Sequence, residues 1–87
     1  MEYTQTIKNF VVENFLFGDD DGLSEDTSFL DDGIIDSTGI LELVSFLEES
    51  YEIRIEDEEL IPENLDSIER IVKFLERKIN GNKLAVN

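Results

Sequence analysis

The chain has 87 residues and a net charge of −15, from 22 acidic and 7 basic side chains. This length fits one small domain, and an apolar content of 40% is enough for a folded core despite the charge. So acidic a surface repels nucleic acid and anionic membranes and attracts basic protein surfaces. Without cysteine or histidine, the chain can form no disulfide, no thiolate zinc site and no imidazole general base.

No apolar segment approaches the ~20 residues that a membrane-spanning helix needs. The first ten residues, MEYTQTIKNF, lack the basic region and the apolar stretch of a signal peptide. We therefore expect a cytoplasmic protein that binds neither membranes nor nucleic acid.

Apolar residues at helical spacing predict a first helix over residues 3–16, and Gly18 supplies a left-handed stop. Residues 17–36 show no sustained period and are rich in Asp, Gly and Ser, which indicates a long loop. Four apolar side chains are expected to pin this loop to the core: Phe29, Leu30, Ile34 and Ile35. Long loops in small domains are often functional.

A second amphipathic helix is expected over residues 37–51, with an apolar inner face and an acidic outer face. The mixed segment that follows predicts a connector and a short third helix near residues 57–60, which Pro62 ends. Asp66 and Glu69 are typical of a capping box that opens the last helix, and Gly81 closes this helix.

These elements predict an all-α fold: a small four-helix bundle of three amphipathic helices and one short helix, with a long loop between the first two helices. Residues 1–80 would form the domain, and residues 81–87 a flexible tail. The self-repulsion of the acidic surface predicts a fold that salt stabilises.

The chain offers little enzymatic chemistry. No histidine or nearby lysine is present to activate the Ser37 hydroxyl, and close pairs of carboxylates arise by chance in so acidic a sequence. The stretch DDDGLSED resembles calcium-loop material, but the EF-hand spacing counted back from Gly22 lands on Phe17, which cannot bind a cation. We expect neither an enzyme nor a metal site.

Ser37 opens the second predicted helix and allows two interpretations. Its hydroxyl could be a helix cap that accepts a hydrogen bond from an orphan amide. Alternatively, a transferase could esterify it with a phosphate-bearing group, because the free amides and the positive dipole of a helix start stabilise a phosphodiester. Asp36 lies next to it and could help orient a metal–phosphate donor.

The segment DDGIIDSTGILELVSFLEESYEIRIEDEEL, residues 31–60, resembles the acyl carrier proteins and their aminoacyl and peptidyl relatives. The mark of that family, a serine that follows an aspartate and opens an acidic amphipathic helix, is present at Asp36 and Ser37. Thr38 stands where the family usually has leucine or isoleucine, and Gly39 where it has a polar residue. With these departures, the chain resembles a stand-alone bacterial carrier of a specialised pathway more than a carrier of a primary fatty-acid synthase.

The resemblance implies that a phosphopantetheinyl transferase attaches 4′-phosphopantetheine covalently to Ser37, and that acyl groups travel as thioesters on the thiol of this arm. The implied partners are the transferase, an acyl- or aminoacyl-activating ligase, and synthase or transferase enzymes with basic docking patches. We expect a monomeric carrier of acyl intermediates. Two alternatives stay open: an aminoacyl or peptidyl carrier loaded by an adenylating ligase, and an unmodified acidic adaptor or nucleic-acid mimic.

Two further sets of residues are candidates for function. The outer side of helix 37–51 is a candidate docking surface, because acidic side chains bind basic patches rapidly and release them easily; its members are Thr38, Leu41, Glu42, Glu48, Glu49 and Glu52. The core between the second and third helices is a candidate acyl pocket lined by Val44, Leu47, Ile55, Leu60 and Leu65. Ordinary packing is the alternative for the pocket residues, and ordinary surface exposure for Leu41.

Overall fold

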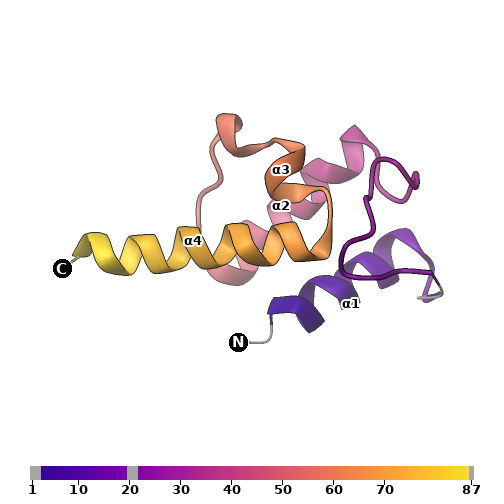
Figure 1. Cartoon of the computed structure of the whole chain (residues 1–87), viewed down its shortest axis with the longest axis horizontal. Coiled ribbons are helices and arrows are strands. Elements are labelled where there is room, and N and C mark those ends of the chain that lie inside the picture. Colours follow the sequence, from indigo (N-terminus) through magenta and orange to yellow (C-terminus); the bar gives the residue numbers. More distant parts are fainter. Residues whose placement is uncertain (1–2, 20–21, 87) are drawn as a thin grey trace.

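The computed structural model describes residues 3–19 and 22–86 and is built of helices (Figure 1). The α-helices are α1 (Tyr3–Phe15), α2 (Ser37–Tyr51), α3 (Pro62–Leu65) and α4 (Ile68–Val86), and a 3₁₀ helix, η1 (Asp57–Glu59), lies between α2 and α3. Within the described ranges there is no β-strand. The expectation of a small all-α bundle is confirmed.

The core joins the apolar stripes of α1, α2 and α4. Its fully buried side chains include Ile7 and Val11 from α1, Leu43 and Leu47 from α2, and Leu75 from α4. Aromatic contacts reinforce the α1–α2 side: the rings of Tyr3 and Tyr51 meet edge to face with centroids 5.1 Å apart, and Phe10 stacks on Phe46 at 4.1 Å. Such ring pairs stabilise beyond the area that they bury.

The long loop between α1 and α2 is fastened to the turn between α3 and α4. Phe29 donates its N–H to the carbonyl oxygen of Asp66 at 2.8 Å, and Leu30 donates its N–H to Asp66 Oδ1 at 2.9 Å. The Ser28 hydroxyl donates to Asp66 Oδ2. Phe29 is fully buried, whereas Leu30 is 44% exposed, so the prediction that Leu30 pins the loop to the core is wrong.

The predicted capping box at the start of α4 is also wrong. Ser67, not Asp66, caps this helix: its Oγ accepts the N–H of Arg70 at 3.1 Å, and its carbonyl accepts the N–H of Ile71. The carboxylate of Asp66 is occupied by the loop instead. Both residue types cap helices well, so their local spacing could not decide between them.

Two predicted helix ends differ from the structure. Pro62 begins α3 rather than ending the short helix before it, because proline lacks the N–H that a first helical residue leaves unpaired anyway. Gly81 does not close the last helix, which continues to Val86. No proline follows Gly81, and a glycine inside a helix weakens it without breaking it. The flexibility of residues 81–87 stays a prediction, and Asn87 lies outside the described residues.

Basic side chains of α4 hold the segment of η1 and α3. Lys78 Nζ bonds to Glu59 Oε1 at 2.9 Å, and Arg77 donates to Asn64 Oδ1 at 2.9 Å. Arg70 donates to the carbonyl of Pro62 at 3.3 Å. In Figure 1, α3 lies against α4, whose C-terminal part extends beyond the other elements.

Candidate functional site

The start of α2 is capped by Asp36. This residue has extended backbone angles (φ −94°, ψ −176°), and its Oδ1 accepts the N–H of Gly39 at 2.8 Å. Ser37 is therefore the first helical residue, and its interpretation as the helix cap is wrong. The adjacent Asp and Ser are equally good caps, so only the backbone geometry separates their roles.

The Ser37 side chain is exposed, and the described part of the chain gives its hydroxyl no hydrogen-bond partner. It lies at the N-terminus of a 15-residue helix that has no acidic residue in its first turn. A helix start carries a positive partial charge and unpaired amides, which favour an anionic group. The residues present therefore fit a phosphodiester on the Ser37 oxygen.

A pocket of about 290 Å³ opens beside Ser37. Among the described residues, Ser37 and Asp66 are the polar members of its lining, and the other walls are apolar: Leu30, Ile40, Leu41, Leu60, Ile61, Pro62 and Leu65. The walls come from the α1–α2 loop, the first turns of α2, and the segment before and within α3. An apolar pocket of this size with a few polar groups is typical of a ligand site.

Only part of the predicted acyl-pocket set borders this pocket. Leu60 and Leu65 line it, whereas Val44, Leu47 and Ile55 are buried in the core and are absent from its walls. Sequence reasoning missed Ile40 as a wall and assigned Leu41 to docking alone. Helical spacing could have found both, because residues three and four positions after Ser37 lie on its face of the helix.

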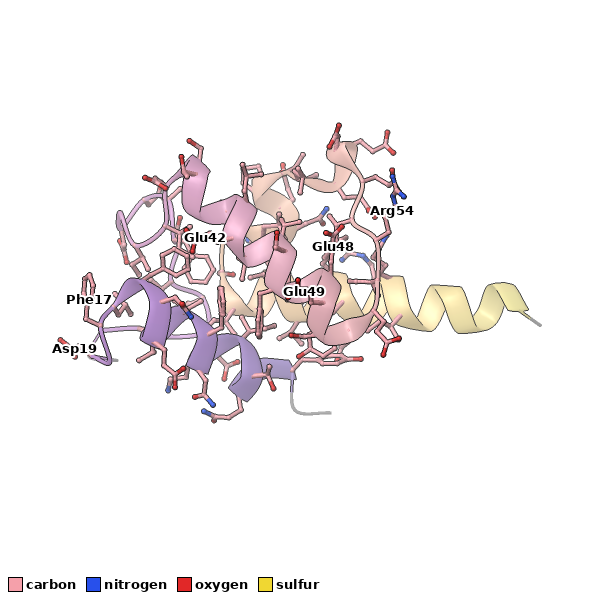
Figure 2. The ribbon with its side chains drawn as sticks, turned by 180° about the vertical axis from the view of Figure 1, so that it is seen from behind. Phe17, Asp19, Glu42, Glu48, Glu49 and Arg54 are labelled. Atoms are coloured by element: carbon pink, nitrogen blue, oxygen red, sulfur yellow. The ribbon has the colours of Figure 1, made fainter. Side chains whose placement is uncertain are left out.

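Three acids of the candidate docking surface, Glu42, Glu48 and Glu49, lie along α2 (Figure 2). Thr38, Leu41, Glu42, Glu49 and Glu52 are exposed, with Leu41 at 57%. Glu48 is only partly exposed, because its Oε2 accepts the N–H of Ile55 at 2.9 Å. Glu52 has a left-handed backbone (φ 54°) and ends α2 by donating its N–H to the Glu48 carbonyl. These two glutamates thus shape the connector as well as the acidic face.

Gly39 is buried where α1, the loop and α2 meet. A Cβ at this position would lie 2.8 Å from both Ile35 Cγ2 and Phe15 Cε1. The missing side chain allows the end of α1 to pack directly on the first turn of α2. Gly39 therefore serves the packing under this turn, in addition to donating its N–H to Asp36.

Two negative findings concern the described residues. No group of three or more Asp or Glu side chains there is placed to hold a metal ion. Nor does any helix in this part of the chain have the length and apolar character needed to cross a membrane.

Comparison with known proteins identifies the class. No protein-family model matches the chain. However, it is 32% identical over 69 residues to the probable acyl carrier protein PigG of Serratia sp., which covers 79% of each chain. It is 36% identical to an acyl carrier protein of Bdellovibrio bacteriovorus (83% of this chain, 88% of that one) and 34% identical to one of Petrotoga mobilis (91% and 89%).

These relatives show that the chain belongs to the acyl carrier protein family, as the sequence predicted. It is a carrier of acyl groups, and the family in general bears a phosphopantetheine group. Among solved structures, a chain described as the crystal structure of an FAD-dependent dehydrogenase superposes with a TM-score of 0.71 at 25% identity. The match covers 79% of this chain and 97% of that chain.

Proposed function

We propose that the Ser37 oxygen is the attachment point of 4′-phosphopantetheine and that acyl intermediates are carried on this arm. The observation that supports the proposal is the division of roles at the start of α2. Asp36 makes the capping bond, and the Ser37 hydroxyl stays exposed and without a partner among the described residues. When bound, the arm supplies a terminal thiol that forms thioesters with acyl groups.

The residues around Ser37 would serve the attached group in two ways. The amides and the dipole at the start of α2 would stabilise the negative charge of the phosphodiester. The apolar walls of the neighbouring pocket, among them Ile40, Leu60 and Leu65, would shelter the apolar cargo from water. Val44, Leu47 and Ile55 would contribute to such shelter only if the core opened, because they are buried behind the pocket.

The partners proposed are a phosphopantetheinyl transferase, an acyl-activating ligase, and synthase or transferase enzymes with basic patches. The acidic face formed by Glu42, Glu48, Glu49 and Glu52 would bring such surfaces together rapidly and release them easily. Leu41, at the mouth of the pocket, would add an apolar contact next to the acids. We further propose that the chain acts as a monomer, since the charge of −15 keeps copies apart. The compartment that we propose is the cytoplasm.

The test is incubation with coenzyme A and a broad-specificity phosphopantetheinyl transferase, followed by intact mass measurement. The wild-type chain is expected to gain one phosphopantetheine, and Ser37→Ala none. Ser45→Ala is the matched control, because Ser45 is an exposed serine of the same helix and its loss should leave the modification intact.

The absence of added mass, or an addition that persists in Ser37→Ala, would refute the proposal. If the unmodified chain were instead an acidic adaptor, the Ser37→Ala variant would keep its biological activity. Loading assays with acyl- and aminoacyl-activating ligases on the modified chain would then separate acyl from aminoacyl cargo.

A further inference from the structure

Three of the four exposed large apolar side chains of the described region lie near the start of α2. Leu30, Leu41 and Ile61, exposed by 44%, 57% and 42%, line the pocket beside Ser37. The fourth such side chain, Phe17, is not part of this pocket and is 94% exposed. An aromatic ring left almost wholly in water is unusual in a small domain, and exposed apolar groups often mark interaction sites.

The backbone holds Phe17 in this position. Its φ of 55° is left-handed, and Gly18 follows with a φ of 89°. The turn is closed by two hydrogen bonds: Gly18 donates its N–H to the carbonyl of Val12 at 2.9 Å, and Asp19 donates to that of Leu16 at 3.0 Å. Bulky residues rarely adopt this conformation. The ring therefore points outward because of how α1 ends, while the preceding Phe15 and Leu16 pack on the core.

Phe17 follows the end of α1, which packs on the first turn of the helix that Ser37 begins. Phe15, two residues earlier, packs against the first turn of α2, since its ring would be 2.8 Å from a Cβ on Gly39. Gly39 in turn follows Ser37 by two residues. The end of α1 and the start of α2 thus form one end of the molecule.

Figure 2 shows the same arrangement from behind. Phe17 and Asp19 lie at one end of the molecule, Glu48, Glu49 and Arg54 lie towards the other, and Glu42 lies between. Phe17 is therefore separate from the acidic C-terminal half of α2.

We propose that Phe17 is a docking contact for the phosphopantetheinyl transferase that modifies Ser37, and that its ring enters an apolar recess bordered by lysine and arginine. This inference rests on the proposed function of Ser37. We assign the contact to the transferase, rather than to other partner enzymes, because the transferase must take the serine oxygen itself into its active site. Its surface must then cover the side chains around the start of α2. Enzymes that act on the thiol at the far end of the arm need not approach so closely.

The basic border follows from the charges around the ring. Glu13, in the last turn of α1, and Asp19 are exposed on either side of Phe17 in sequence. An apolar recess ringed by cations complements an aromatic ring flanked by carboxylates. The net charge of −15 opposes the two other occupants, a second copy of the chain and an anionic membrane.

The experiment compares two substitutions in the intact chain. Phe17→Asn removes the ring but keeps the fold, because asparagine accepts the left-handed backbone more readily than phenylalanine does. Phe17→Tyr keeps the ring and is the matched control. The readouts are kcat and KM for modification by the broad-specificity transferase, with unfolding in urea measured alongside.

For Phe17→Asn we expect KM to rise about tenfold, as for the loss of a buried aromatic contact, with kcat nearly unchanged. The ratio of the KM of Phe17→Asn to the wild-type KM should stay the same at high salt, where contacts of the acidic face are screened. Phe17→Tyr should keep the wild-type KM. An unchanged KM for Phe17→Asn overturns the inference while Ser37 is still modified, whereas no modification of any variant would refute the proposed function instead. Sedimentation that shows a wild-type dimer lost in Phe17→Asn, or ring-dependent binding to phosphatidylcholine vesicles, would also overturn it by assigning the ring to another occupant.

Discussion

The two long connections of this molecule are held in place by different chemistry. The loop from α1 to α2 is held by neutral donors: two backbone N–H groups and the Ser28 hydroxyl bind Asp66. The connection from α2 to α4 is held by cations of α4, with Lys78 on Glu59 and Arg77 on Asn64. Each connection supplies one side of the pocket beside Ser37, since Leu30 comes from the first and Leu60 from the second.

The difference shows that the pocket depends on α4, although the described residues that line it come from other elements. Helix α4 holds the second connection through its cations, and it also holds the first, because the N–H of Glu69 binds the carbonyl of Glu25 at 2.8 Å. The first anchor relies on hydrogen bonds from neutral donors, most of them to Asp66, whereas the second includes the Lys78–Glu59 ion pair. We therefore expect the first side of the pocket to respond to mutation of one residue and the second to respond to pH and salt as well.

The largest effect is expected from Asp66→Ala. This change removes the acceptor of the Ser28 hydroxyl and of the Leu30 N–H, and hydrogen bonds to charged groups contribute about 1.5–3 kcal/mol each. Because the site is partly exposed, we expect the free energy of unfolding to fall by about 2 kcal/mol in urea titrations. Asp66→Asn keeps an oxygen acceptor and should lose about half as much. Equal stability of wild type and Asp66→Ala would show that the carboxylate of Asp66 contributes nothing to holding the loop.

A smaller effect, outside both connections, is expected from Gly39→Ala. Helix propensity alone favours alanine by up to ~1 kcal/mol. The new Cβ would meet Ile35 and Phe15 at 2.8 Å, and overpacking of this kind costs about 1–3 kcal/mol. We expect a net loss of about 1 kcal/mol by urea unfolding. Thr38→Ala, at the exposed neighbouring position, is the control and should change stability by less than ~0.5 kcal/mol; a stabilised Gly39→Ala would contradict the packing argument.

The smallest effect is expected from Glu59→Gln, and it should depend on pH. Burial alone would raise the pKa of Glu59, but the hydrogen bond from the Glu56 N–H and the ammonium of Lys78 outweigh it and lower the pKa below its ordinary value of 4.5. A lowered carboxyl pKa stabilises the fold above the unfolded value, and this stabilisation is lost as the pH falls through the folded value.

At neutral pH we expect Glu59→Gln to reduce the free energy of unfolding by about 0.5–1 kcal/mol, and we expect the difference to disappear on acidification below pH 4.5. Urea unfolding across this pH range checks both. Glu69→Gln breaks the more exposed pair with Lys73 and is the matched control, with little effect at any pH. A difference that stayed constant with pH would exclude the ion pair as its cause.

Much of the helical framework could be predicted from the sequence because it follows from local spacing. The apolar stripes gave α1 and α2, and the acidic segment at residues 57–60 gave η1. Helix ends were less predictable. A proline such as Pro62 can either end a helix or begin one, and a glycine such as Gly81 weakens a helix without ending it. The residue types alone therefore do not decide where the helices near these two positions begin and end.

The site was predictable as far as it is local. Ser37 and the acids of α2 lie in one segment, and their exposure follows from the helical period. The role of Asp66 was not predictable, because its partners Ser28 and Leu30 are nearly 40 positions away and only the fold brings them together. The exposure of Phe17 was not predictable either, since it depends on the left-handed backbone at the end of α1.

The capping bond made by Asp36 has a consequence for a carrier that must change its load repeatedly. The bond that keeps the first turn of α2 wound does not pass through the neighbouring hydroxyl. The arm that we propose for that oxygen would therefore be attached, and its thiol loaded and unloaded, while the helix keeps its start. Apo, holo and loaded forms would share one backbone, so a partner would distinguish them by the cargo rather than by the shape of the domain.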